Sequence, residues 1–283
     1  LTELCGTGCA HSSFGSPLHK RPGINDLAQH PEALVDWLRS AGARKFVACG
    51  GGEPLDEPDF LDRAIAACAR SGMPLEIYTG GVPSKGSMSA ADYLHRWIAA
   101  ASQAPGRPAQ LRIRLSVDRF HEERVGLQPL AEWVYHAERL VPDWPIAFRS
   151  VRLSNDDSVE RLAALLGGIL TRNSERSGRI TLPNARAITV EWKGFVFERR
   201  GRSRVLDARD LHLTDADNAV IGELESVHGR NSELGRPLSA RLTVSRKLLD
   251  LEIHADCVVH ILESHAPDLR LSFKDTPWND MRL

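Results

Sequence analysis

Several features that would assign this chain to a class of partner are missing from it. Lysine and arginine number 36 and aspartate and glutamate 37, so the formal net charge is −1 over 283 residues. That balance gives no electrostatic case for nucleic acid or a membrane surface as a partner. No apolar run comes near the roughly 18 residues of a membrane-spanning helix, and no signal peptide is visible. We therefore expect no nucleic acid and no membrane among its partners.

Cysteine is also scarce, with five in the whole chain: Cys5, Cys9, Cys49, Cys68 and Cys257. An odd number, of which two are clustered, is not a disulfide framework. It is typical of a protein in a reducing compartment that carries a metal or redox site. We therefore expect a cytoplasmic protein. The sequence also has no internal repeat and no low-complexity tract.

Hydrophobic residues make up 42% of the chain, which is enough for a core. They are arranged in alternating strand-like and helix-like segments. Helices are expected at 31–41, 58–70, 90–101, 128–140 and 158–170, and strands at 45–48, 75–79, 111–117 and 146–153. Such alternation predicts an α/β fold with a parallel sheet or barrel. Beyond it we expect an exposed loop at 171–184, a strand within 187–197 and a hairpin at 249–262. A core of residues 1–180 is then followed by 181–283, with the last barrel strand or strands and a C-terminal extension.

The opening stretch, LTELCGTGCAHSSFGSP, places Cys5 and Cys9 four residues apart in a loop with glycines between them. A further step of three reaches Ser12. With a cysteine there the pattern would be CxxxCxxC, which ties three thiolates of one loop to three irons of a [4Fe-4S] cluster. Thiolates suit soft iron–sulfur sites. The alternatives are two ordinary loop thiols or a zinc site, and zinc is disfavoured because four ligands at zinc spacing are absent.

Three further motifs follow predicted strands: CGGGEPL at 49–55, YTGG at 78–81 and LSVDRFHEE at 115–123. Parallel α/β sheets carry their chemistry at the carboxyl ends of the strands. Glycines there let the backbone approach a ligand closely. Taken alone, the GGE segment would be an ordinary turn between a strand and a helix. Taken together, the motifs predict one site at the carboxyl edge of the sheet.

In order and spacing, these four motifs resemble those of the radical S-adenosylmethionine (radical SAM) enzymes, over roughly the first 153 residues. The resemblance implies a partial (β/α)6 TIM-like barrel with a short C-terminal extension. It also implies a [4Fe-4S] cluster, S-adenosylmethionine (SAM) and an electron donor such as flavodoxin or ferredoxin. In this family the cluster cleaves SAM reductively to a 5′-deoxyadenosyl radical, which takes a hydrogen atom from a substrate. By analogy, a peptide or a small metabolite is the expected substrate, and no catalytic residue is implied.

The resemblance also implies residues for the cofactors. The cluster ligands would be Cys5 and Cys9, with Ser12 at the position of the third cysteine. Gly51, Gly52 and Glu53 would meet the amino group of SAM, through backbone carbonyls and, in some members of the family, through the glutamate side chain.

Four more residues are implied as SAM contacts. Ser116 and Asp118, at the end of the fourth strand of the family's barrel, would bind the ribose or the methionine carboxyl region, and Thr79 would act similarly. Arg149 is the cation chosen for the SAM carboxylate, because a guanidinium can bind a carboxylate with paired hydrogen bonds. A helix N-cap or a salt bridge is the alternative role for Asp118, and a surface ion pair that for Arg149.

Ser12 is the main departure from the family, since a neutral hydroxyl is a poor iron ligand. Three interpretations remain open: an engineered Cys→Ser form, a natural member with a different third ligand such as His11 or Ser12 itself, or a homologue that no longer builds the cluster. The last would be a cluster-less binding protein for SAM or a peptide.

Two smaller expectations also follow from the resemblance. Because a strand precedes the cysteine loop in the family and only LTEL stands before Cys5, we expect a trimmed start. Because Cys257 is the only cysteine in the last third of the chain, we expect no auxiliary cluster.

Overall fold

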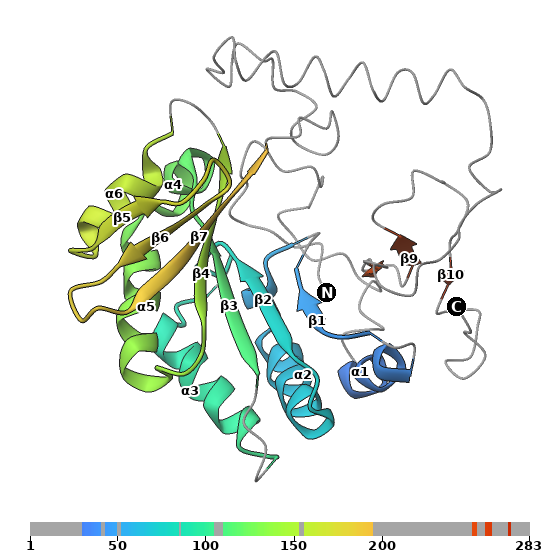
Figure 1. Ribbon diagram of the computed structural model, residues 1–283. Coiled ribbons are helices and arrows are strands. Elements are labelled where there is room, and N and C mark those ends of the chain that lie inside the picture. Colours follow the sequence, from blue (N-terminus) through green and yellow to red (C-terminus); the bar gives the residue numbers. More distant parts are fainter. Residues whose placement is uncertain are drawn as a thin grey trace, which may run out of the picture.

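The computed structural model describes residues 30–40, 43–49, 52–84, 86–104, 110–152 and 156–194, and short strands at 251–253, 258–261 and 271–272 (Figure 1). The described helices are α1 (Pro31–Ser40), α2 (Pro58–Ser71), α3 (Ala90–Ala101), α4 (Arg119–Val125), α5 (Gln128–Leu140) and α6 (Ser158–Leu165), with a short 3-10 helix η2 (Pro54–Asp56). The described strands are β1 (Phe46–Ala48), β2 (Leu75–Thr79), β3 (Leu111–Ser116), β4 (Ile146–Arg152), β5 (Ile169–Arg172), β6 (Ser177–Thr181), β7 (Ala187–Gly194), β8 (Leu251–Ile253), β9 (Val258–Ile261) and β10 (Leu271–Ser272). None of these helices is long and apolar enough to cross a membrane.

Seven strands form one sheet in the order β1-β2-β3-β4-β7-β6-β5. Strands β1 to β4 are parallel neighbours in chain order, and β7 lies parallel to β4. Strands β5, β6 and β7 then form an antiparallel meander. Within the described residues the sheet is open, because β1 and β5 each pair on one side only. The predicted α/β class with a mostly parallel sheet is therefore confirmed.

The helices lie on one side of this sheet. When parallel strands follow one another in order, right-handed crossovers place successive helices on the same face. The helix contacts agree, because α1 packs on α2, α2 on α3, α3 on α5 and α5 on α6 (Figure 1). We call the covered side the helix face and the opposite side the inner face.

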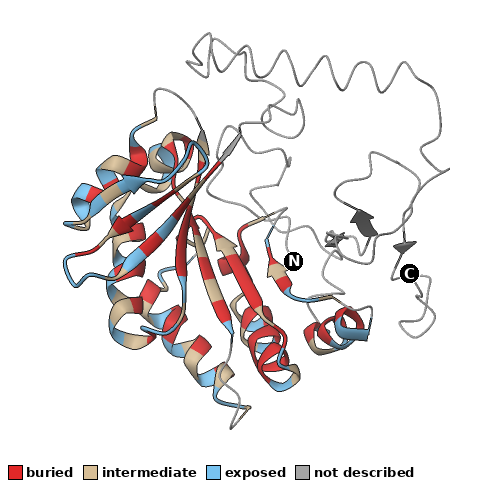
Figure 2. Ribbon diagram, in the orientation of Figure 1, coloured by how far each residue is buried: buried red, intermediate tan, exposed pale blue. Residues whose placement is uncertain are grey.

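The helix face is the apolar core. Ile77 and Ile113 pair in register on β2 and β3, and Leu115 pairs with Phe148 on β4; all four are 0% exposed. Burial of such a side chain is worth about 1.5–3 kcal/mol. Figure 2 shows the buried residues running along the central strands and the helix sides that meet them.

The inner face is polar. Strand β3 reads LRIRLS, and its burial alternates from residue to residue. Arg112 and Arg114 therefore point to the side away from the helices, beside Glu76 and Tyr78 of β2, with which they pair in register. Central strands of a parallel sheet are normally apolar on both faces, so this charged face is an unusual feature of the sheet.

Local sequence signals explain most of the element ends. Helix α3 begins with a capping box in which Ser89 and Asp92 bond each other's backbone. Helix α2 has Pro58 in its first turn and ends at Gly72, whose φ of 70° is left-handed. The predictions for strand 75–79 and helices 90–101 and 128–140 are confirmed to the residue.

The prediction of an exposed loop at 171–184 was wrong. That stretch contains the end of β5 and all of β6, which form a hairpin, and the helix expected to run to residue 170 ends at Leu165. The helix ends early because Gly167 adopts a φ of 64° and the close approach of Ile180 leaves no room for a side chain at Gly168. Polar residues hide this hairpin in the sequence, since β5 is largely exposed.

The remaining strands, β8, β9 and β10, form a second antiparallel sheet with β9 in the middle. Strands β8 and β9 are the hairpin predicted within 249–262. The expected division at residue 180 falls inside β6, so the two predicted parts share the seven-stranded sheet.

Candidate cofactor and substrate site

The described residues of the sequence motifs gather at the carboxyl edge of the parallel strands. Glu53 follows β1, Thr79 ends β2, Ser116 ends β3 and Asp118 follows it. Arg149 lies on β4 in register with Ser116. Thr79 pairs with Leu115 on the helix face, whereas Ser116 and Arg149 lie on the inner face. The structure therefore divides the predicted site residues between two sides of one edge.

Glu53 joins the loop after β1 to the loop after β2. Its Oε1 accepts a hydrogen bond from the Leu55 backbone N–H at 3.1 Å and one from the Thr79 hydroxyl. Its Oε2 accepts one from the Gly80 N–H at 2.9 Å. The side chain is only 4% exposed. Because its carboxylate is used inside the protein, contact between this motif and SAM would come from the backbone.

The same carboxyl group titrates in an unusual range. Burial raises the pKa of Glu53 to about 7, although the hydrogen bonds from Thr79, Gly80 and Leu55 act to lower it. Near neutral pH a proton can therefore enter or leave this connection between the two loops. Because Glu53 is enclosed, its role is to hold the two loops together rather than to act as an acid or base on a substrate.

Further bonds attach these loops to the helices. The Tyr93 hydroxyl of α3 donates to the Leu55 carbonyl at 2.7 Å, and Trp133 Nε1 of α5 donates to the Gly81 carbonyl at 2.8 Å. Gly81 has a φ of 87°, and a Cβ there would lie 2.8 Å from Leu130 Cδ2. The second glycine of YTGG is therefore required by its conformation and by this close packing.

Asp118 forms the N-cap of α4. Its Oδ1 accepts from the backbone N–H groups of Phe120 at 3.0 Å and His121 at 3.1 Å, and its Oδ2 lies 2.9 Å from His121 Nδ1. The side chain is 2% exposed. These contacts match the N-cap role that the sequence left as the alternative for Asp118.

Arg149 occupies a different environment. Its strand neighbours are Ser116 on β3 and Glu191 on β7. The Glu191 carboxylate, however, binds Arg114 at 2.5 Å, and Arg149 lies over the Tyr78 ring at 5.0 Å. Within the part of the chain that the structure describes, neither the Arg149 guanidinium nor the Ser116 hydroxyl has a hydrogen-bond partner. This pair can therefore bind a carboxylate.

A network of charges continues from Arg149 across the inner face. Glu76 lies 3.3 Å from Lys45, 3.4 Å from Arg114 and 3.8 Å from Arg112. Glu191 also reaches Arg112 at 3.5 Å. We call this set the inner-face cluster; its members are Lys45, Glu76, Tyr78, Arg112, Arg114, Arg149 and Glu191.

The cluster sets the ionisation of its buried members. Burial acts to raise the pKa of Glu76, but attraction to Arg114, Lys45 and Arg112 outweighs it and lowers that pKa. Burial raises the pKa of Tyr78, whose hydroxyl donates to Glu76 at 3.2 Å. At neutral pH Glu76 is therefore charged and Tyr78 is protonated.

Sequence reasoning found Arg149 but missed the rest of the inner-face cluster. The available signal was the alternation of LRIRLS at 111–116 inside a sheet predicted to be parallel. Charged residues at every second position of a central parallel strand indicate a polar face that faces a cavity or a ligand.

Four of the predicted site residues lie outside the described residues: Cys5, Cys9, Ser12 and Gly51. In the described segments between residues 30 and 194 and in the three C-terminal strands, no three His, Cys, Asp or Glu side chains are grouped to hold a metal ion. Cys68 is buried on α2, and burial raises its pKa to about 12, so it is an inert core thiol.

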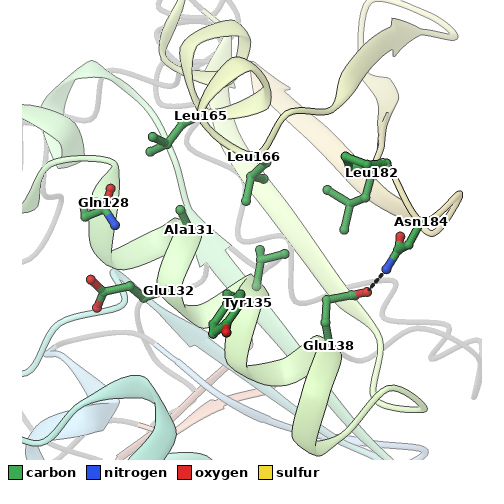
Figure 3. Close-up of a pocket in the computed structure, with 11 residues that line it drawn as sticks. Gln128, Ala131, Glu132, Tyr135, Glu138, Leu165, Leu166, Leu182 and Asn184 are labelled. Carbon is green, nitrogen blue, oxygen red and sulfur yellow. Dashed lines mark hydrogen bonds between the residues drawn. The ribbon is translucent and has the colours of Figure 1, made fainter.

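A cavity of about 530 Å³ lies elsewhere, on the outer side of the molecule (Figure 3). It lies between α5, α6 and the turn that joins β6 to β7. Its lining is mostly apolar, and Asn184 donates a hydrogen bond to Glu138 across it at 2.6 Å. None of the motif residues lines it. We therefore place the candidate site at the carboxyl edge and inner face rather than here.

No protein-family model matches the chain, and no curated protein matches it either. The functional assignment therefore depends on the residues themselves.

Proposed function

We propose that this chain is a radical SAM enzyme built on a partial (β/α) barrel. The observation that carries the proposal is the bond between two of its motifs: Glu53 of GGGEP accepts hydrogen bonds from Thr79 and Gly80 of YTGG. Ser116 of the third motif ends the next strand. Motifs that are far apart in the sequence thus meet at the edge where parallel α/β folds carry their chemistry.

The fold supports the finer prediction of a TIM-like partial barrel in one respect. Strands β1 to β4 follow one another in order with their helices on one side, as barrel strands do and doubly wound sheets do not. The last three strands of the sheet differ from repeated β/α units, because β5 and β6 form an antiparallel hairpin beside β7.

In this proposal Cys5 and Cys9 would hold a [4Fe-4S] cluster through two thiolates. The cluster and SAM, when bound, would supply the chemistry of reductive cleavage and of hydrogen abstraction from a peptide or small metabolite. Ser116 and Arg149 fit the carboxylate of SAM, since both lack a hydrogen-bond partner in the described part of the chain and a guanidinium pairs well with carboxylates. The protein's own contribution is to hold the ligand and exclude water. A donor such as flavodoxin or ferredoxin would supply the electron in the cytoplasm.

Ser12 decides between this enzyme and the second candidate, a cluster-less protein that binds SAM or a peptide. A serine hydroxyl replaces the third thiolate, and it is too weak an acid to ligate iron as a thiolate does. We therefore propose that the cluster is weakened or absent in this chain and restored by Ser12→Cys.

The test is the iron and sulfide content after anaerobic reconstitution of this chain and of Ser12→Cys. We expect about four irons in Ser12→Cys and fewer in the parent. If neither protein takes up a cluster, the enzyme proposal is wrong and the binding protein remains. If the parent chain takes up a full cluster without the Ser12→Cys substitution, then His11 or Ser12 is a ligand. The proposal that Ser12 weakens the cluster is then wrong.

A further inference from the structure

The inner face carries more positive than negative charge. Arg179 of β6 pairs with Thr189, which pairs with Ala147 of β4, so Arg179 lies on the same face as the inner-face cluster. Among the residues whose side chains the structure describes, the face therefore holds five cations and two carboxylates, an excess of three positive charges: Lys45, Arg112, Arg114, Arg149 and Arg179 against Glu76 and Glu191. The whole chain has a net charge of −1, so this excess is local.

The two carboxylates pair with the cations of β3 and with Lys45 beside β1. Glu76 and Glu191 bind Lys45, Arg112 and Arg114. Arg149 and Arg179 have no carboxylate partner in the described part of the chain. A half-buried guanidinium such as Arg149 without a counter-ion is unfavourable unless a ligand supplies one. The SAM carboxylate proposed above would pair with Arg149 and leave Arg179 without a counter-ion. SAM also brings an ammonium and a sulfonium, so it does not balance the face.

The spread of these cations indicates the size of the ligand. From Lys45 beside β1 to Arg179 on β6 they cross six adjacent strands, a path along the sheet of roughly 24 Å at about 4.8 Å between strands. A small metabolite with one anionic group would meet one or two of them. An extended peptide of about seven residues covers the same length.

The aromatic ring of Tyr78 lies on β2, the second of the six strands that these cations cross. Arg114 and Arg149 each lie 5.0 Å from its centroid. This arrangement holds both guanidinium groups in place and adds an apolar surface between two charged positions. A peptide with acidic side chains and an apolar residue among them matches that order of charge and ring.

We propose that the inner face binds an acidic peptide, and that this peptide is the substrate class of the site. The assignment as substrate rests on the proposed function. The binding itself depends only on the charges of the face, and it requires neither a cluster nor cleavage of SAM.

The experiment measures binding of a fluorescein-labelled glutamate peptide of about seven residues to the full chain by fluorescence anisotropy, with a glutamine peptide of equal length as the control. We expect the glutamate peptide alone to bind, with an affinity that falls as salt rises. The assay contains no SAM, so Arg149 is free to bind the peptide, and Arg149→Gln and Arg179→Gln should each weaken binding by about fivefold. Arg139→Gln, on the outer helix α5, is the matched control and should leave the affinity unchanged.

For Glu191→Gln, the direction of the change in peptide affinity is the decisive result. This substitution removes the carboxylate that competes for Arg114 and Arg112, so we expect it to tighten binding by about fivefold. A variant that merely folds poorly would bind less, not more. Opposite shifts for Glu191→Gln and Arg149→Gln thus support the proposal independently of folding.

Four results would overturn the proposal. The first is equal binding of the glutamine peptide, and the second is a shift of Glu191→Gln and Arg149→Gln in the same direction. The third is equal binding of a uridine oligonucleotide of the same charge, which would mean a general anion site. The fourth is displacement by free glutamate at the peptide's own concentration, which would mean a site for a single anion. Failure of the proposed function would instead leave peptide binding intact and abolish SAM cleavage, so the two failures are distinguishable.

Discussion

The two faces of one sheet follow different rules in this protein. Phe148 and Arg149 are neighbours on β4, yet Phe148 is 0% exposed against the helices while Arg149 lies over Tyr78 on the inner face. The helix face excludes every charge in its central rows, and the inner face pairs charges across three strands. The difference predicts that stability depends mainly on the helix face, and it is the basis of our proposal that the inner face binds the ligand.

The largest effect that tests this difference is the replacement of Phe148 by alanine. We expect Phe148→Ala to lower the free energy of unfolding by about 3–5 kcal/mol, because it removes buried contacts and leaves a cavity. Arg149→Ala should cost less than about 1 kcal/mol, since a partly exposed cation–π contact is weak. Urea unfolding of both variants measures the two values. Equal losses would mean that the inner face is as structural as the helix face.

The second effect concerns the edge where the two faces meet. The pKa of Glu53 is raised from 4.5 in the unfolded chain to about 7 in the fold. Its stabilising contribution is therefore fully present below about pH 4.5 and is lost as the pH rises through about 7. The stability of the parent relative to Glu53→Gln should fall by an amount on the order of 2–3 kcal/mol between about pH 5 and about pH 7.5.

Urea midpoints of both proteins at the two pH values measure this change. Glutamine does not titrate, so Glu53→Gln supplies the baseline for all other groups. The same difference at both pH values would mean that Glu53 is ionised throughout and that burial does not govern it.

A smaller effect separates the two roles considered for Asp118. Asp118→Ala should lower stability by about 0.5–2 kcal/mol through loss of the α4 N-cap, whereas Asp118→Asn should retain most of it. Thermal unfolding measures both. If Asp118→Ala is as stable as Asp118→Asn and as the parent chain, the capping bonds contribute little to stability. A ligand contact then becomes the better explanation of Asp118.

The sequence predicted the helices and the buried strand 75–79 well and the β5–β6 hairpin poorly, for a physical reason. Apolar periodicity and caps are local signals, so strand 75–79 and helices 90–101 and 128–140 were predicted to the residue. The hairpin of β5 and β6 gave no such signal, because its outward residues are polar and it is stabilised by pairing with β7.

The site was predicted by position but not by contact. Glu53, Thr79, Ser116 and Arg149 do lie at the carboxyl edge. The contacts depend on strand register and on side-chain rotamers over long separations in the chain. Examples are the hydrogen bond from Gly80 to Glu53 and the ion pair of Glu191, which forms with Arg114 rather than with its strand neighbour Arg149. Only the alternation in LRIRLS gave a local sign of the charged face.

The most direct test of the central claim is production of 5′-deoxyadenosine from SAM by reconstituted Ser12→Cys, with and without dithionite, beside the parent chain. We predict that Ser12→Cys forms 5′-deoxyadenosine only with the reductant and that the parent forms much less. A Ser12→Cys protein that carries its full cluster and still leaves SAM intact under reductant would contradict the radical SAM account.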